Sequence, residues 1–260
     1  MATYVLVHGT GSGGWLWDPV AELLREAGHS VYTPTLVGVG ECASEGGPET
    51  NLTTHVHQIV SLIQHEAAPR VALVGFSYSG LVVEGVAAAI PDRIAQLVLI
   101  DALLVPQGQC GFDAFPPEAV ADFRAAARDQ GDGWKLPPFP LERVGGIGPV
   151  ESGVRFADVE RTLLERRGTH PIGSYEEPVT WDAASLAGVA RRYVICTGKP
   201  SPMREQLTAR ARELRESGWL VDELATGHFP MRSMPDALTA ILLSCVTLAP
   251  ADGDEGSTVP

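Results

Sequence analysis

Two serines lie in the stretch VALVGFSYSG at residues 71–80, where an apolar run gives way to a helical pattern. A serine in such a strand-to-helix turn is held clear of the backbone, so that its hydroxyl can act as a nucleophile if the residues two before and two after are small. Gly75 and Ser79 meet this condition around Ser77, whereas the bulky Leu81 disfavours Ser79. The spacing therefore predicts Ser77 as a nucleophile. The alternative is that Ser77 merely caps the following helix.

Backbone donors for an oxyanion are predicted in the stretch HGTGSGGWLW, which follows the first apolar run. Its glycines allow a backbone to approach a ligand closely, and tetrahedral intermediates need such N–H donors. We expect the amides of Thr10 and Tyr78 to form this oxyanion hole. A dinucleotide site is disfavoured, because the glycines are spaced too closely for G-x-G-x-x-G and no acidic residue ends the second strand.

If the catalytic residues follow one another along the chain as serine, acid and histidine, the histidine that acts as general base must come after the last strand. His228, in ATGHFPMRSMP, meets this requirement, and the alternative for it is an ordinary surface-loop histidine. His8 precedes the glycines and is expected to be structural. His55, His57 and His65 share one helical stretch without a metal-binding pattern, and we expect them on the helix surface.

The elements that must position these residues alternate along the chain. Strands are predicted at 3–8, 30–35, 70–76, 94–101, 191–197 and 219–225, and their nearly continuous apolar runs suit parallel strands covered on both faces. Helical patterns lie between them, including one in which Asp18 is expected to cap. The fold class predicted is α/β, with a doubly wound, mostly parallel six-stranded sheet and helices on both faces. Ligand sites of such sheets lie beyond the carboxyl ends of the strands.

Residues 103–186 interrupt this alternation with a segment rich in Pro and Gly that holds two plausible helices. A long insertion is typical of a functional element, and we expect a helical lid over the sheet edge. The predicted core is then 1–102 and 187–250, followed by a frayed tail at 251–260. Among the aromatic residues of the lid, Trp134, Phe139 and Phe112 are predicted to bind an apolar substrate, although core packing could account for half of the aromatic set.

The composition excludes several classes of partner. The formal net charge of −13 disfavours nucleic acid and anionic membranes, although solubility alone explains such a charge. The four cysteines are scattered without zinc-site spacing, so we expect no metal, no cofactor and a reducing compartment. No signal peptide or 20-residue apolar span is seen, so a cytoplasmic protein is predicted.

Together, HGTGSGGWLW, GFSYSG and TGHFPMRSMP resemble the α/β-hydrolase superfamily. The resemblance is strongest to the plant-type branch of methylesterases, salicylate-binding esterases and hydroxynitrile lyases, with its bacterial esterase relatives. Two residues separate this chain from the lyases. Gly9 follows the first histidine as in the esterases, and Phe229 follows His228 where one lyase lineage carries Lys. Both differences favour hydrolysis.

The acid of the catalytic triad departs from the plant pattern. Plant members place it in the loop that corresponds to TGKPSP, which here contains no carboxylate. Some hydrolases of this superfamily take the acid from the strand after the elbow helix, and Asp101 ends that strand. An ionisable residue there needs a hydrogen-bond partner such as an imidazole. Asp101 is therefore the predicted acid. One alternative is that Asp101 caps the first turn of the lid. Another is that Asp222 serves instead, although it lies within the last strand and precedes His228 too closely in the sequence.

The resemblance implies a cofactor-independent, carboxylesterase-type serine hydrolase that acts on a small-to-medium apolar ester, thioester or lactone. A lyase or cyclising acyl transferase on the same fold remains an alternative, because fold does not fix the reaction. A receptor-like binder of a small molecule is a second alternative. A small-molecule ester is the expected partner, and a homodimer is left open.

Overall fold

The computed structural model describes residues 1–65, 68–198 and 203–247, and the predicted tail at 251–260 lies outside this range. A parallel sheet forms its centre, with the strand order β2-β1-β3-β4-β7-β8. The strands are β1 (Thr3–Val7), β2 (Ser30–Tyr32), β3 (Val71–Phe76), β4 (Ile94–Ile100), β7 (Arg191–Cys196) and β8 (Leu220–Leu224). The predicted α/β class and six-stranded sheet are confirmed, although β2 is shorter than expected.

The apolar runs are continuous because both faces of the sheet are covered. Along β1, Val5 and Val7 belong to one hydrophobic cluster, whereas Tyr4 and Leu6 belong to the other. All four side chains are fully buried. Neighbouring residues of a strand point to opposite faces, so a strand between two helical layers has no position that favours a polar residue.

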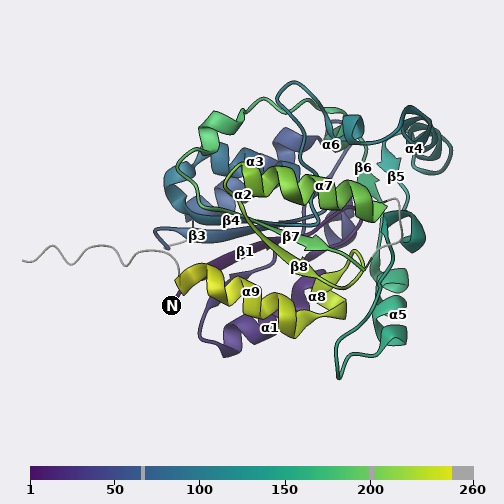
Figure 1. The fold of residues 1–260 in the computed structure, drawn as a ribbon. Coiled ribbons are helices and arrows are strands. Elements are labelled where there is room, and N and C mark those ends of the chain that lie inside the picture. Colours follow the sequence, from purple (N-terminus) through teal and green to yellow (C-terminus); the bar gives the residue numbers. More distant parts are fainter. Residues whose placement is uncertain (66–67, 199–202, 248–260) are drawn as a thin grey trace, which may run out of the picture.

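Helices form a layer on each side of this sheet (Figure 1). One layer contains α2 (Leu52–His65), α3 (Ser79–Ala89) and α7 (Met203–Glu216), and the other contains α1 (Asp18–Glu26), α8 (Pro230–Ser233) and α9 (Pro235–Thr247). The predicted cap at Asp18 is wrong. Asp18 is already the first helical residue, and the preceding Trp17 makes no side-chain cap. The carboxylate of Asp18 still lies in the first turn, where it interacts favourably with the helix dipole.

Most of residues 103–186, which we call the insertion, lies at one end of the sheet, and its last part, at 183–186, packs on α3 (Figure 1). The insertion holds α4 (Pro117–Gln130), α5 (Phe156–Arg166), α6 (Gly173–Glu176), and the antiparallel strands β5 (Lys135–Leu136) and β6 (His170–Pro171). The two strands were not predicted, because two residues are too few to show an alternating pattern. The insertion is tied to the core loop after β8, since the amide of His228 donates to the carbonyl of Gly146 over 2.8 Å.

Candidate active site

The turn between β3 and α3 holds Ser77 in a left-handed backbone conformation, with φ of 55°. This conformation is costly for a residue with a side chain, by about 1–3 kcal/mol, and is tolerated where the surroundings enforce it. Ser77 is held on both sides, because its amide donates to the carbonyl of Ile100 (3.2 Å) and its carbonyl accepts from the amide of Leu103 (2.9 Å). The hydroxyl is thereby turned towards the carboxyl edge of the sheet.

The small neighbours of Ser77 are required by close approaches. A Cβ on Gly75 would lie 2.5 Å from Cγ2 of Val83 and 2.8 Å from the carbonyl oxygen of Ser79. Ser79 is fully buried, and its hydroxyl accepts from the amide of Phe76 (2.8 Å) and donates to the carbonyl of Val7 (2.8 Å). Ser79 therefore braces the turn between two strands, and its hydroxyl is engaged away from the cavity.

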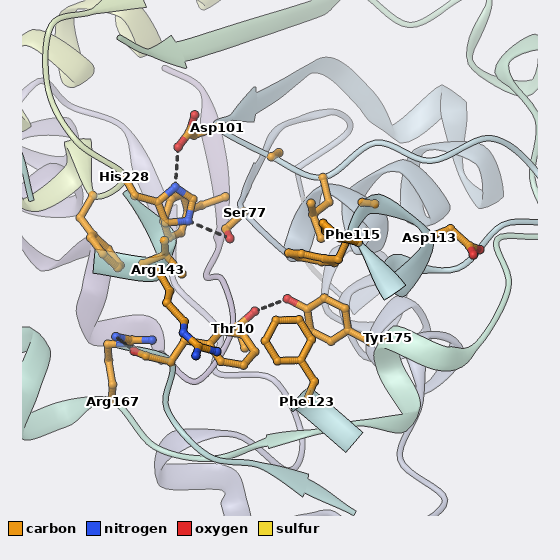
Figure 2. A pocket seen from close by; sticks show the side chains of 18 residues that line it. Thr10, Ser77, Asp101, Asp113, Phe115, Phe123, Arg143, Arg167, Tyr175 and His228 are labelled. Atoms are coloured by element: carbon orange, nitrogen blue, oxygen red, sulfur yellow. Dashed lines mark hydrogen bonds and ion pairs between the residues drawn. The ribbon is translucent and has the colours of Figure 1, made fainter. Parts of the chain in front are cut away.

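Asp101 follows β4 and also has a left-handed backbone, with φ of 47°. Its amide donates to the carbonyl of Val194 on the neighbouring strand over 2.8 Å. The carboxylate accepts a short hydrogen bond from Nδ1 of His228, and Nε2 of His228 lies 3.0 Å from the hydroxyl oxygen of Ser77 (Figure 2). The Asp101 side chain is fully buried, and the imidazole is 10% exposed. The three predicted residues thus form one hydrogen-bonded chain, in which Ser77 can donate its proton to the imidazole.

Asp222, the competing acid, is used elsewhere. Asp222 lies on β8, where it is paired in register with Val194 of β7. Its carboxylate forms an ion pair with Arg192, also on β7. The hydroxyl of Ser244 accepts a further hydrogen bond from the same arginine over 2.7 Å. Asp222 therefore fastens the edge of the sheet to α9. Residues 199–202 of the TGKPSP loop lie outside the described residues.

Thr10 lies in the loop after β1 and, like Ser77, lines the cavity described below. The backbone hydrogen bonds of turns and loops in the described residues include none donated by the amide of Thr10 or by the amide of Tyr78. The Thr10 hydroxyl is 2.5 Å from the hydroxyl of Tyr175 (Figure 2). The next residue, Gly11, has φ of 63°, and its carbonyl accepts from the amide of Gly168 over 2.7 Å. The insertion thus braces the loop at two points.

Comparison with known proteins agrees with this architecture. The model of the alpha/beta hydrolase family matches residues 4–241. The chain belongs to this family.

The relatives of this hydrolase include named esterases. It is 35% identical to the carbendazim hydrolyzing esterase of Nocardioides sp. (strain SG-4G) over 247 residues, which cover 92% of this chain and 97% of that protein. It is 26% identical to the putative methylesterase 14, chloroplastic, of Arabidopsis thaliana, with coverage of 92% and 70%. These relatives confirm the sequence prediction of a carboxylesterase-type hydrolase.

Solved structures show the same fold. An extracellular alpha/beta-hydrolase from a Paenibacillus species superposes on this hydrolase with a TM-score of 0.71 at 23% identity, covering 94% of this chain and 99% of that one. At this level of identity the likeness speaks for the fold alone.

Three histidines of this hydrolase, His8, His55 and His170, are fully buried. His8 donates from Nδ1 to the carbonyl of Gly9 and accepts at Nε2 from the amide of Leu36, and burial lowers its pKa to about 4. This agrees with its expected structural role. His170 is also buried, with a pKa well below its ordinary value because of desolvation.

The prediction for His55 is wrong, because this side chain is fully buried rather than on the helix surface. Its Nδ1 is 2.8 Å from the hydroxyl of Tyr78, and Nε2 donates to the carbonyl of Val37 over 2.9 Å. Burial lowers its pKa to about 4. His57 and His65 are exposed as expected. Helical periodicity did identify the apolar stripe beside His55, but it does not show that a loop from another part of the chain covers the adjacent position.

A cavity of about 600 Å³ opens above Ser77 (Figure 2). Ser77, Asp101 and His228 lie in its wall, and its apolar surface comes largely from aromatic side chains, namely Phe76, Phe115, Phe123, Phe139, Tyr175 and Phe229. A volume of this size fits a small-to-medium ligand. No three side chains of His, Cys, Asp or Glu gather as a potential metal site within the described ranges.

Of the predicted substrate-binding residues, Phe139 lines this cavity, whereas Phe112 and Trp134 do not. Phe112 is 3% exposed and stacks on Tyr175 at 5.3 Å between ring centroids, so it supports the wall from behind. The ring of Trp134 instead contacts the ammonium group of Lys135, 4.7 Å from its centroid. Composition identified the insertion as aromatic, but which ring faces the cavity depends on tertiary packing.

Sequence reasoning missed two arginines of the wall, Arg143 and Arg167. Nothing in the stretch LLERRG distinguishes Arg167 from the preceding Arg166, and only the end of α5 decides which of them faces inward.

None of the described helices is both long and apolar enough to cross a membrane.

Proposed function

We propose that this hydrolase cleaves small-to-medium, largely apolar carboxylic esters through an acyl-enzyme on Ser77. The hydrogen-bonded chain from Asp101 through His228 to Ser77, at the base of the aromatic cavity, carries the proposal. The names of the methylesterase relatives favour methyl esters within this class.

In the first half-reaction, Ser77 Oγ attacks the ester carbonyl carbon while His228 Nε2 takes the hydroxyl proton. The amides of Thr10 and Tyr78 stabilise the negative charge on the former carbonyl oxygen. Asp101 orients the imidazole and stabilises its charged form. Collapse of the intermediate breaks the bond to the alcohol, which leaves with the proton from His228.

In the second half-reaction, His228 removes a proton from water, and the hydroxide attacks the acyl carbonyl carbon. The second tetrahedral intermediate collapses, the bond to Ser77 Oγ breaks, and the proton returns to that oxygen. The products are an alcohol and a carboxylic acid, and the enzyme regains its starting state.

The insertion is part of the proposal as a lid and as a wall of the substrate cavity. It supplies Phe115, Phe123 and Phe139, and its backbone braces both the loop of Thr10 and the loop of His228. Apolar side chains at this position favour burial of an apolar substrate and exclude water from the intermediate. A cytoplasmic location and a homodimer stay predictions.

The test combines turnover with covalent labelling. The wild-type enzyme should hydrolyse p-nitrophenyl butyrate and should be labelled by a fluorophosphonate, because that probe reacts with an activated serine. Ser77→Ala should lose the label and at least about 1,000-fold of kcat, since its nucleophile is gone. Ser61→Ala, an exposed position on α2, is the matched control and should behave as wild type. Undiminished labelling of Ser77→Ala would overturn the assignment.

A further inference from the structure

Arg167 is fastened at the edge of the cavity by its neighbours in the chain. It directly follows α5, and the amide of the next residue, Gly168, donates to the carbonyl of Gly11 over 2.7 Å. A Cβ on Gly11 would lie 2.5 Å from the carbonyl oxygen of Gly168, so the two backbone segments are in direct contact. The backbone of Arg167 is therefore fixed to the same loop that carries Thr10.

The guanidinium of Arg167 is also positioned by specific contacts. Nη1 donates to the carbonyl of Phe139 over 2.8 Å, and Cζ lies 5.9 Å from the ring centroid of Phe229. The Phe229 ring in turn is 5.2 Å from that of His228. These contacts place the positive charge in the cavity wall, one aromatic ring away from the base (Figure 2).

In the part of the chain that the structure describes, this charge has no acidic partner. Among the described residues no carboxylate forms an ion pair with Arg167, and neither Nε nor Nη2 donates a hydrogen bond to another described group. Burial lowers the pKa of this arginine, which shows the same lack of compensation. A largely buried, unpaired charge is destabilising, and native proteins retain one where a ligand completes it.

The neighbouring Arg166 has the environment that is usual for a surface arginine. Arg166 is half exposed, lies 3.8 Å from a carboxylate oxygen of Asp18, and stacks over the ring of Trp15 at 4.8 Å. It does not line the cavity. A second arginine of the wall, Arg143, has a side chain that is 61% exposed and forms an ion pair with Asp122 over 3.9 Å. Arg143 thus lies at the solvent side of the wall and has an acidic partner, like Arg166.

The opposite side of the cavity differs in character. Phe115, Phe123 and Tyr175 lie across from the two arginines in Figure 2. Among the described residues of the wall, the only carboxylates are Asp101, which is hydrogen-bonded to His228, and Asp113, which accepts from the amide of Cys110 over 2.7 Å. A substrate held here would therefore meet an apolar surface on one side and an uncompensated cation on the other.

We infer that Arg167 binds an anionic group of the substrate, and that the preferred substrates are esters with a free carboxylate beside an apolar body. This inference rests on the proposed esterase function of the same site and specifies its substrate class. A guanidinium with free N–H groups matches a carboxylate in charge and geometry. Because the enzyme as a whole is acidic, its long-range field would repel such substrates, so only a local cation can favour them.

The test compares matched anionic and neutral esters. The pairs are mono-p-nitrophenyl glutarate with p-nitrophenyl hexanoate, and 4-carboxyphenyl acetate with 4-carbamoylphenyl acetate, which carry the anion on the acyl and the alcohol side respectively. We expect wild-type kcat/KM to favour the anionic member of at least one pair by roughly 10- to 100-fold, the range of a charge-assisted hydrogen bond. Arg167→Gln should remove this preference and leave the neutral esters within a few-fold.

Three variants separate binding of the anion from general damage. Arg167→Lys keeps the charge but loses the fork and should retain part of the preference. Arg166→Gln should leave the preference unchanged. Melting temperatures of all variants show whether each one folds. No preference in wild type for either pair, or a preference that survives in Arg167→Gln, would overturn the inference.

A binding measurement keeps the inference separate from the esterase proposal. Ser77→Ala, which cannot form the acyl-enzyme, should bind the anionic member of at least one of the two pairs roughly 10- to 100-fold more tightly than its neutral partner by calorimetry. Adding Arg167→Gln to this variant should equalise the two members of that pair. Equal affinities of Ser77→Ala for the members of both pairs would refute anion binding even if the enzyme is an esterase. A clear carboxylate preference without turnover in wild type would refute the esterase proposal alone.

Discussion

Asp101 combines two roles at one position, because it ends a buried strand and also meets the imidazole of His228. Its left-handed backbone turns the chain out of β4, and its fully buried carboxylate is stabilised in part by the hydrogen bond from Nδ1 of His228. Without that carboxylate, the base would lose both its orientation and the partner of its charged form.

We therefore expect Asp101→Asn to lower kcat for p-nitrophenyl butyrate by roughly 1,000- to 10,000-fold, with a smaller effect on KM. Steady-state kinetics measure this directly. Asp222→Asn is the matched control. It breaks the ion pair with Arg192 and should lower the melting temperature while kcat stays within a few-fold. A normal kcat for Asp101→Asn would exclude this residue as the acid.

Residues at strand ends were predictable from the sequence, whereas most cavity-lining residues of the insertion were not, with Phe139 as the exception. Ser77, Asp101 and His228 each follow a strand, and the carboxyl ends of parallel strands meet at one edge, so their convergence follows from topology. Arg167 and Phe115 lie between the regular elements of the insertion. No repeating period there relates sequence position to the direction of a side chain.

Among the elements, the tight connection between β3 and α3 depends on the absence of a side chain at Gly75. The strand leaves the sheet and the helix returns over it within two residues, so the first turn of α3 packs directly on the end of β3. A methyl group at Gly75 would meet Val83 at 2.5 Å and the backbone of Ser79 at 2.8 Å. The helix cannot accept this group without moving away from the strand.

Gly75→Ala should therefore lower the free energy of unfolding by about 1–3 kcal/mol, the usual cost of overpacking, and slow fluorophosphonate labelling of Ser77. Urea unfolding and labelling kinetics test the two effects. Gly188→Ala is the control, because a Cβ there has no neighbour within 4 Å, and its stability should stay within about 0.5 kcal/mol of wild type. Equal stabilities of both variants would contradict the close packing described for this turn.

The elements of the core were also more predictable than those of the insertion. All six strands of the main sheet were expected, because each is an apolar run long enough to be recognised. The antiparallel pair β5–β6 consists of two residues on each side, and its pairing depends on chain segments more than 30 residues apart. Such a pair is held by the packing of the insertion, which local propensity does not contain.

For the whole molecule, buried titratable groups determine how stability depends on pH. Burial lowers the pKa of His8 and His55 to about 4, and it raises that of Glu84 on α3 to about 8, with a partial offset from Arg210 and Arg191. The ordinary values, which the unfolded chain has, are 6.5 and 4.5. The folded and unfolded states therefore bind different numbers of protons over two overlapping ranges of pH.

The two ranges act in opposite directions. Between pH 4 and 6.5 the unfolded chain protonates His8 and His55 more than the folded protein does, so the free energy of unfolding rises with pH. Between pH 4.5 and 8 the folded protein holds the proton of Glu84 more firmly, so this group lowers the free energy of unfolding as pH rises. Each group contributes about 1.4 kcal/mol per pH unit where the two states differ by a full proton.

We expect these opposing slopes to give a maximum of stability near pH 6.5, with a decline towards pH 8 that belongs to Glu84. Glu84→Gln keeps the shape of the side chain but removes the titration, so the decline between pH 6.5 and 8 should disappear, while the fall below pH 6.5 should remain. Urea unfolding at pH 5, 6.5 and 8 measures both slopes. Glu223→Gln, at an exposed position on β8, should keep the wild-type profile. An equally steep decline in Glu84→Gln would show that the decline does not come from Glu84. Glu84 would then be ionised in the folded protein as it is in the unfolded chain, and a group that titrates alike in both states contributes no slope.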